Sequence, residues 1–174
     1  MKEASTIRVA TRSDAEGIAR TRVEGWQSAY RGIMPDAFLD SMSVAADLER
    51  MASWAWDEGG TSQWVSEVDG EIVGWACMII PARDESLGDD VAEIAACYVR
   101  PTVWGGGHGH RLMTEALDAA RKHGITEVIL WVLEDNAQAQ HFYTRQGFEH
   151  DGARKLEDHL PQMPLAVVRM RQLL

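Results

Sequence analysis

The sequence predicts one mixed α/β (α+β) domain that spans residues 1–174. Two strand-like runs flank the pair Asp69-Gly70, which is the strongest short-range signal of a hairpin. Farther on, helical patterns alternate with an almost wholly apolar run at 127–133, which is typical of a strand covered on both faces. No repeat or linker divides the chain, and 174 residues are enough to bury one substantial core.

The first third of the chain is predicted to be mainly helical. Ser13 and Glu16 have the spacing of a capping box, which satisfies free N–H groups at a helix start. Gly32 and Pro35 then interrupt the helical pattern, and Gly59-Gly60 closes the region. The expected elements are a strand at 6–10, a helix from about 14 to 30, and two shorter helical segments at 35–41 and 45–58.

The remaining two thirds alternate strands with helices. A single apolar stripe at helical spacing marks one helix; it consists of Leu112, Met113, Ala116, Leu117 and Ala120. Gly124 and Gly147 stand where two helices are expected to end. The expected strands are 63–68, 71–80, 91–99, 127–133, 148–154 and 165–174, and the expected helices are 111–123 and 136–146.

Composition and charge exclude several classes of protein. The chain is 45% apolar and 25% charged, as in an ordinary globular protein. Its formal net charge of −10 argues against nucleic acid as a partner and mildly favours cationic small molecules. The apolar runs are far shorter than the roughly 20 residues of a membrane helix, and the first residues have no apolar signal region, so we expect a cytoplasmic protein that does not bind membranes. Cys77 and Cys97 lie in strand-like segments, and we expect buried free thiols.

A glycine-rich stretch, VWGGGHGH at 103–110, comes directly before a predicted helix. Glycine loses the most backbone entropy on ordering, so such a cluster serves positive φ angles or close approach of a ligand. The first N–H groups of a helix lack partners and carry the positive end of its dipole, so the stretch predicts a phosphate site, with a flexible turn as the alternative. The absence of lysine and the glycine spacing exclude a P-loop and a dinucleotide fingerprint.

Three stretches resemble the GNAT superfamily of N-acetyltransferases. Residues 98–112 are similar to its acyl-CoA loop, in which an Arg or Gln, two residues, Gly, one residue and Gly or Ala follow a central strand; Gly107 and Gly109 take the glycine positions. Trp104 stands where the family usually has Arg or Gln, which leaves the backbone amides as the main anion ligands. NAQAQHFYTRQGF at 136–148 resembles the family's Asn-x-x-Ala-x-x-Phe-Tyr-x-x-x-Gly-Phe block, and GWQSAYRGIMP at 25–35 resembles a first-helix signature of one bacterial branch.

The resemblance implies a mixed central sheet with helices on both faces and a splay between the two central parallel strands, 91–99 and 127–133. It also implies acetyl-CoA as cosubstrate, with the pantetheine in the splay and the pyrophosphate on the amides of the glycine stretch. We expect no metal, because His108 and His110 have no evident third ligand. The residues expected to contact the cofactor are Cys97, Val99, Trp104, Gly105, Gly106, Gly107, His108, Gly109, His110, Asn136 and Tyr143.

Acetyl transfer to an amine needs a neutral nucleophile, donors for the developing oxyanion and a proton for the departing thiolate. The resemblance implies that the N–H of Val99 polarises the thioester carbonyl and that Tyr143 is the general acid, with core packing as the alternative for Tyr143. Glu93, the one charged side chain of strand 91–99, matches the glutamate that some members use as a base, often through water. Apolar neighbours make a carboxylate hold its proton more firmly, which suits a base near neutral pH; the alternative is a Glu93 that faces solvent. Asn136 caps its helix, binds the pantetheine, or does both.

The acceptor side is less clearly marked in the sequence. Trp26, Tyr30, Met34 and Trp75 are expected to wall the acceptor pocket, because the first two helices of family members often line that side. The leading interpretation is direct transfer of an acetyl group to a primary amine of a small molecule or peptide. The alternatives are a non-catalytic acyl-CoA-binding or sensing protein of the same fold, and a transferase for longer acyl chains. Homodimers are frequent in the family, so a homodimer stays open.

Overall fold

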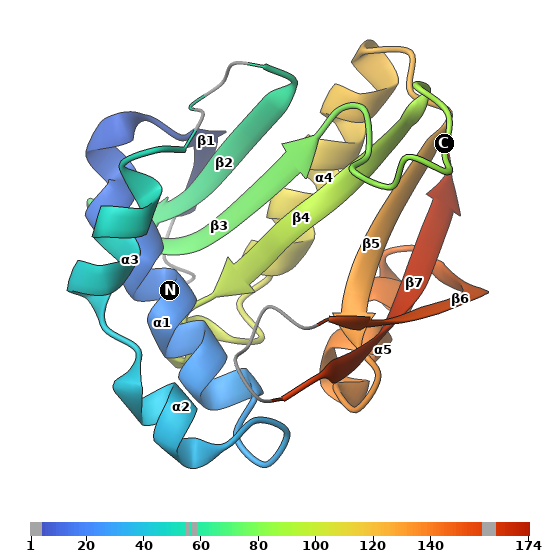
Figure 1. The fold of residues 1–174 in the computed structure, drawn as a ribbon. Helices are drawn as coiled ribbons and strands as arrows, with labels where there is room; N and C mark the ends of the chain where they lie inside the picture. The colour runs from blue at the N-terminus through green and yellow to red at the C-terminus, as the bar shows by residue number, and fades with distance from the viewer. Residues whose placement is uncertain (1–4, 55, 57–58, 158–162) are drawn as a thin grey trace.

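The computed structural model describes residues 5–54, 56, 59–157 and 163–174 and confirms a mixed α/β architecture (Figure 1). Its seven described strands form one sheet in the order β1-β2-β3-β4-β5-β7-β6; β4 and β5 pair in parallel and the other neighbours pair antiparallel. The elements are β1 Ser5–Val9, α1 Ala15–Ala29, α2 Asp36–Ser41, α3 Val44–Met51, β2 Thr61–Val68, β3 Glu71–Ile79, β4 Val91–Val99, α4 His108–Lys122, β5 Glu127–Leu133, α5 Ala137–Arg145, β6 Glu149–Glu157 and β7 Leu165–Leu173.

The capping box lies before the predicted position, at the 3-10 turn Arg12–Asp14 that leads into α1. The carboxylate of Asp14 accepts hydrogen bonds from the backbone N–H of Thr11 at 2.8 Å and from its hydroxyl at 3.1 Å. Arg8 of β1 donates to the same carboxylate through both terminal nitrogens at 2.8 Å. The predicted capping box of Ser13 and Glu16 is therefore wrong, because Asp14 joins the first strand to the first helix and takes that role.

α3 is shorter than the predicted helix at 45–58. It ends at Met51, and Trp54 then stacks on Trp75 of β3 with ring centroids 5.5 Å apart. Packing of this aromatic pair outweighs continuation of the helix, since a buried aromatic pair removes a large apolar area from water. Residues 55, 57 and 58, which the prediction also included, lie outside the described residues.

The hairpin around Asp69-Gly70 is confirmed. Asp69 has φ 51° and Gly70 has φ 83°, and two consecutive positive φ angles are what a type I′ turn requires. The pairing of β2 with β3 runs from Thr61 opposite Ile79 to Val68 opposite Glu71, with one register shift.

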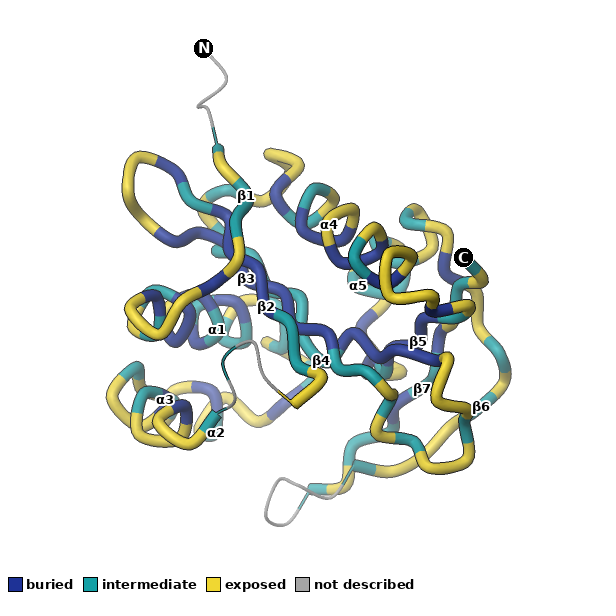
Figure 2. Tube along the Cα trace, turned by 90° about the horizontal axis from the view of Figure 1, so that it is seen from above, coloured by how far each residue is buried: buried dark blue, intermediate teal, exposed yellow. Residues whose placement is uncertain are grey.

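Helices cover both faces of the sheet (Figures 1 and 2). α1 packs on β3 and β4 together with α3, whereas α4 packs on β2, β3 and β4 from the opposite face. The predicted apolar stripe of α4 is buried along its whole length, as Figure 2 shows for that side of the helix. A fully buried side chain such as that of Leu112 contributes about 1.5 to 3 kcal/mol through removal of apolar surface from water.

β4 and β5 separate part of the way along their length. Their pairing begins with Val91 opposite Glu127 and stops at Ile94 opposite Leu130. Beyond that point β4 pairs with β3, and β5 pairs with β7, to their ends. A register shift that leaves Ala95 as an extra residue in β4 lies where the separation starts. The predicted splay is thus confirmed, and the facing backbone edges of 95–99 and 131–133 are not paired with each other.

Candidate active site

Two pockets meet within the splay. The loop pocket, of about 600 Å³, lies between the end of β4, the glycine stretch and α5. The strand pocket, of about 850 Å³, follows β4 from Glu93 to Tyr98 and reaches α1, β5, β6 and β7. Six residues line both pockets: Ala29, Cys97, Tyr98, Asn136, Ala139 and Tyr143. A molecule in one pocket can therefore reach a molecule in the other at this junction.

The glycine stretch forms the N-terminus of α4, which begins three residues before the predicted start at Arg111. Gly105 and Gly107 have φ angles of 80° and 83°, in the left-handed region that favours glycine. The N–H of Arg111 donates to the carbonyl of Gly107 at 3.1 Å and makes the first hydrogen bond of the helical ladder, so the N–H groups of Gly109 and His110 precede that ladder. These residues line the loop pocket, which places the positive end of the helix dipole there.

The other two glycines of the stretch are required by packing. A Cβ on Gly109 would lie 3.1 Å from Cζ of Phe142 in α5, and one on Gly106 would lie 3.0 Å from the ring of His108. Both distances are tighter than ordinary van der Waals contact. The four glycines therefore serve different purposes: Gly105 and Gly107 allow the turn of the backbone, Gly106 leaves room for the ring of His108, and Gly109 lets α4 approach α5 closely.

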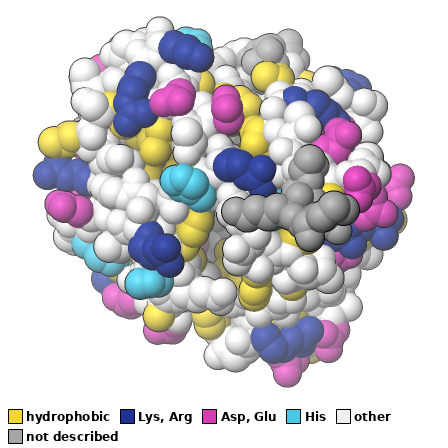
Figure 3. Space-filling model, turned by 180° about the vertical axis from the view of Figure 1, so that it is seen from behind, with side chains coloured by type: hydrophobic (Ala, Val, Ile, Leu, Met, Phe, Trp, Pro, Cys, Tyr) yellow, Lys and Arg dark blue, Asp and Glu magenta, His cyan; other side chains and the backbone are white. Residues whose placement is uncertain are grey.

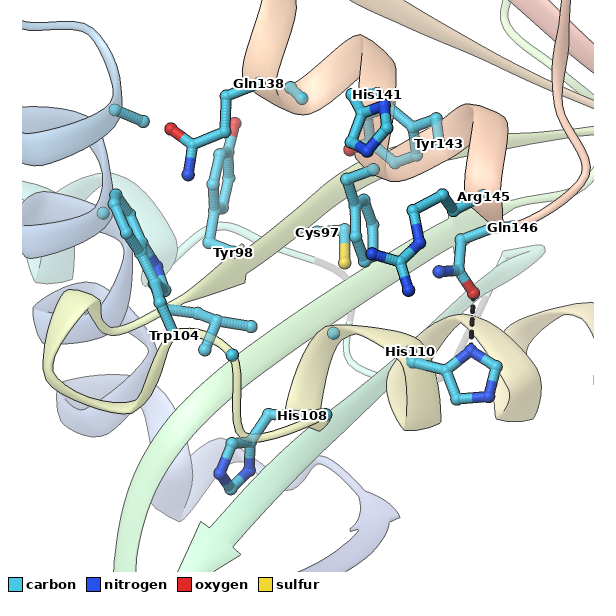
Figure 4. Close-up of a pocket in the computed structure, with 18 of the residues that line it drawn as sticks. Cys97, Tyr98, Trp104, His108, His110, Gln138, His141, Tyr143, Arg145 and Gln146 are labelled. Atoms are coloured by element: carbon cyan, nitrogen blue, oxygen red, sulfur yellow. Dashed lines mark hydrogen bonds between the residues drawn. The ribbon is translucent and has the colours of Figure 1, made fainter.

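Trp104 closes the loop back onto β4. Its indole N–H donates to the carbonyl of Val99 at 2.8 Å, while its ring stays 42% exposed and lines the loop pocket. Figure 4 shows Trp104, Tyr98 and Gln138 on one side of this pocket and His110, Arg145 and Gln146 on the other. Trp104, which stands where the acyl-CoA loop pattern has an anion-binding Arg or Gln, therefore stabilises the shape of the pocket.

The two histidines of the glycine stretch point to different elements. The buried His108 shares a hydrogen bond of 2.9 Å with the hydroxyl of Ser66 in β2. His110 shares one of 2.7 Å with Oε1 of Gln146 (Figure 4). Within the described ranges, no three His, Cys, Asp or Glu side chains form a group that could hold a metal ion.

Cys97 and Tyr143 lie together at the junction of the two pockets (Figure 4). Burial raises the pKa of the Cys97 thiol to about 12. Burial, and less strongly the neighbouring Cys97 and Tyr98, raise the pKa of the Tyr143 phenol well above its ordinary value of 10.0. Both groups therefore keep their protons at neutral pH, so the thiol is a poor nucleophile and the phenol is a hydrogen-bond donor.

Of the three tyrosines of the chain, Tyr98 and Tyr143 lie at this junction and Tyr30 lines the strand pocket beside it. Tyr30 follows α1, Tyr98 belongs to β4 and Tyr143 belongs to α5. Burial, followed by the neighbouring Tyr98 and Tyr143 phenols, raises the pKa of Tyr30. Trp26 packs edge-on against Tyr30, with ring centroids 4.9 Å apart. Phenol groups from three different parts of the chain thus lie close to the point where the pockets meet.

Three of the four residues predicted to wall the acceptor side line the strand pocket: Trp26, Tyr30 and Met34. The fourth prediction, Trp75, is wrong. Trp75 is buried behind Tyr98, with ring centroids 6.0 Å apart, and its indole N–H donates to Gln63 at 2.9 Å. The alternation of side chains along β3 directs Trp75 into the core beneath α1 and α3.

Glu93 is 3% exposed and lines the strand pocket, so the alternative in which it faces solvent is wrong. The expectation of purely apolar neighbours is also wrong. The backbone N–H of Arg83 donates to Oε2 at 3.0 Å, and the guanidinium of Arg83 donates to both carboxylate oxygens. This ion pair stabilises the charged carboxylate in a buried position. Cys97 lies four residue steps after Glu93, which corresponds to about 13 Å along β4.

Asn136 caps α5, because its Oδ1 accepts a hydrogen bond from the N–H of Ala139 at 3.0 Å. It also lines both pockets, so the same side chain has access to a bound molecule. The predicted cap is confirmed, while its contact with a pantetheine stays a prediction.

Five residues that line the pockets were not among the expected site residues: Arg83, Tyr98, Trp131, Arg145 and Lys155. Tyr98 and Trp131 could have been found, since each lies in a strand that the splay opens. Arg83 and Lys155 carry no such signal, because they reach the pocket from a loop and from an edge strand that are distant in sequence.

The outer surface gives little further indication of function. On the face seen from behind, basic and acidic side chains lie among one another and hydrophobic side chains form small separate groups (Figure 3). Among the described helices, none is long and apolar enough to cross a membrane.

Comparison with known proteins agrees with this geometry. A family model described as the GNAT acetyltransferase family matches residues 25–148. A protein of Mycobacterium tuberculosis that is named as an N-acetyltransferase is 30% identical over 147 residues, which are 84% of this chain and 80% of the relative. The mycothiol acetyltransferase of Amycolatopsis mediterranei is 35% identical over 108 residues, but these are 60% of this chain and 34% of that protein.

Solved structures share the fold. The PaiA N-acetyltransferase of Thermoplasma acidophilum, solved with coenzyme A, superposes with a TM-score of 0.70 and 21% identity over 98% of this chain and 99% of that one. The YncA protein of Salmonella typhimurium, solved with acetyl-CoA, superposes with a TM-score of 0.69 and 22% identity over 98% of this chain and 94% of that one. At such identities the likeness concerns the fold.

The high pKa of the Cys97 thiol has a measurable consequence. In a Cys77→Ala variant, which leaves Cys97 as the one thiol of the chain, the rate of alkylation by iodoacetamide should rise about tenfold per pH unit up to about pH 10. The rate can be followed by mass spectrometry. The same variant unfolded in guanidinium is the control, and its rate should level off above about pH 9. A native rate that levels off near the same pH would contradict the assigned burial of the thiol.

Proposed function

The chain belongs to the GNAT acetyltransferase family, and we propose that it moves the acetyl group of acetyl-CoA directly to a primary amine of a small molecule or peptide. The observation that carries the proposal is the junction of the loop pocket and the strand pocket at Cys97, Tyr98 and Tyr143. Two separate pockets that share one wall allow two substrates to be bound at once, as direct transfer requires.

The residues of the loop pocket fit coenzyme A. The N–H groups of 108–110 at the positive end of α4 suit a pyrophosphate, and Arg145 adds a cation to the same pocket. The backbone edge of 95–99 that does not pair with β5 suits the amide groups of a pantetheine. Their N–H and C=O groups would find hydrogen-bond partners there, as those of a neighbouring β-strand do. Acetyl-CoA supplies the acetyl group as an activated thioester. The N–H of Val99, on this edge, is our proposed donor to the carbonyl oxygen.

Direct transfer is favoured over a covalent acetyl-enzyme. Cys97 is the one thiol at the junction, and its pKa of about 12 leaves a negligible thiolate fraction at neutral pH. The other side chains shared by the two pockets are two phenols, an amide and two alanines, none of which is paired with a base that would activate it as a nucleophile. The amine therefore attacks without a protein-bound intermediate.

Tyr143 is the proposed general acid. Its phenol keeps a proton at neutral pH because burial raises its pKa, and it lies beside Cys97 at the junction. A thiol has an ordinary pKa of about 8.5, so a departing thiolate accepts a proton once a donor is within hydrogen-bond reach.

Glu93 is retained as the proposed base, acting through water. Its carboxylate lies in the strand pocket, and about 13 Å of strand between it and the junction excludes direct contact with an attacking amine. Water in the strand pocket would carry the proton over that distance. The ion pair with Arg83 holds the carboxylate in place for this role.

Replacement of Tyr143 by Phe tests the proposed acid. We expect turnover to fall about tenfold or more, because the thiolate loses its proton donor, while the Kd for coenzyme A stays within about twofold. Thiol release and isothermal titration measure the two quantities. Tyr30→Phe is the matched control, since it removes a hydroxyl that lines only the strand pocket, and it should lower turnover less. A matching loss of coenzyme A binding would assign Tyr143 to packing instead.

Replacement of Glu93 by Gln tests the proposed base. We expect kcat/KM at neutral pH to fall about tenfold or more, because the variant can accept no proton. Glu85→Gln, at an exposed carboxylate of the same pocket, is the control and should keep kcat/KM. If Glu93→Gln keeps kcat/KM and only lowers Tm, the carboxylate is structural.

A further inference from the structure

One wall of the strand pocket already holds a primary ammonium group. Nζ of Lys155 lies 4.4 Å from the ring centroid of Trp131 and 2.8 Å from Oε1 of Glu157. All three residues line the pocket. An aromatic face with a carboxylate beside it is the arrangement that recognises an alkylammonium ion, through cation–π attraction and a charge-assisted hydrogen bond. This ammonium site is occupied by the protein's own lysine.

The lysine is held loosely. The side chains of Lys155 and Glu157 are 46% and 25% exposed, and ion pairs as accessible as these contribute little to stability. Lysine has a long flexible stem and a strongly hydrated head, so withdrawal into solvent costs little. A ligand ammonium can therefore take its place on Trp131.

The surrounding charges favour that exchange. With Lys155 withdrawn, the described residues around this site include two guanidinium groups, Arg83 and Arg169, the second with its Cζ 5.6 Å from the ring of Trp131. Five carboxylates outnumber them: Asp84, Glu85, Glu93, Asp151 and Glu157. Arg83 is paired with Glu93, and Arg169 is paired with Asp84 and Asp151. The excess is negative, which attracts a cation and repels a carboxylate-bearing acceptor.

We propose that the acceptor is a diamine, or a longer amine with a second ammonium group, whose distal ammonium displaces Lys155 from Trp131 and Glu157. This inference rests on the proposed function. The pocket follows six consecutive residues of β4, from Glu93 to Tyr98, or about 16 Å, so it accommodates an extended chain. Ile94, Val132, Leu133 and Val167 provide apolar surface for the methylene groups.

The other end of the acceptor meets the junction of the pockets. There the neutral amine nitrogen forms a bond to the thioester carbon and the carbon–sulfur bond breaks. Tyr143 gives its proton to the departing sulfur, and the nitrogen loses one proton through the water of the strand pocket to Glu93. A proton then passes from Glu93 through water to the phenolate of Tyr143, so the products are a neutral amide and the free thiol. The distal ammonium keeps its charge throughout, so it affects binding rather than the chemical step.

The test compares three acceptors of equal carbon number: cadaverine, n-pentylamine and δ-aminovalerate. They differ at the distal end, which is an ammonium, a methyl and a carboxylate. We expect kcat/KM for cadaverine to exceed that for pentylamine about fivefold or more, mainly through KM, with aminovalerate the poorest. Binding of each amine to the protein saturated with coenzyme A, followed by isothermal titration, should give the same order without any acetyl transfer.

Substitutions in the ammonium site distinguish it from general charge attraction. Glu157→Gln and Trp131→Leu should bring the ratio of cadaverine to pentylamine close to one. Lys155→Met should raise the ratio, because it removes the competing ammonium. Glu149→Gln is the control for overall charge, since this exposed residue of β6 lines neither pocket, and it should leave the ratio unchanged.

Each outcome decides the proposal. Equal kcat/KM and equal binding for cadaverine and pentylamine, or a preference for aminovalerate, overturns the diamine inference while thiol release still supports the acetyltransferase. A fall in the ratio for Lys155→Met also overturns it, because Lys155 would then assist the acceptor. If cadaverine binds selectively but no thiol is released from acetyl-CoA, the ammonium site stands and the proposed function fails.

Discussion

The loss of backbone pairing between β4 and β5 beyond Ile94 is the constraint on which the site depends. Buried N–H and C=O groups must find partners, and β3 and β7 satisfy only the outer edges of the two strands. The inner edges are left facing each other across the junction of the two pockets. Because the glycine stretch follows β4 and α5 follows β5, the same separation also brings Gly107 at the start of α4 and Tyr143 in α5 to one place.

Burial raises the pKa of the acidic groups at the junction, whereas the buried carboxylate Glu93 of the strand pocket is stabilised by an ion pair. Phenols and a thiol at the junction lose the water that would stabilise their charged forms, so Tyr143 and Cys97 stay neutral. The charged groups of the strand pocket lie farther along β4 and toward its rim, where Arg83 and Glu93 stabilise each other. A neutral junction between an anion site and an acidic pocket suits a reaction in which a neutral amine must reach a thioester.

Features set by short stretches of sequence were predicted better than contacts between segments that are distant in sequence. The hairpin at Asp69-Gly70 and the cap by Asn136 follow from backbone rules, the splay is what the resemblance to the family implies, and the structure confirms all three. The failures come from side chains that meet across the fold. Trp75 packs into the core beneath α1 and α3, and Arg83 reaches Glu93 from a loop, so neither arrangement follows from neighbours in sequence. The acceptor side is built from elements that are far apart in the sequence, so it is the least predictable part.

The central claim is that the splay and the N-terminus of α4 together hold coenzyme A. The most direct measurement is isothermal titration of the purified protein with acetyl-CoA, coenzyme A and NAD in parallel. The account predicts binding of the first two at micromolar concentration and none of NAD, because the glycine stretch lacks a dinucleotide fingerprint but presents the amides of 108–110 to a pyrophosphate. Failure of acetyl-CoA to bind would contradict the account, since the loop pocket would then serve another ligand.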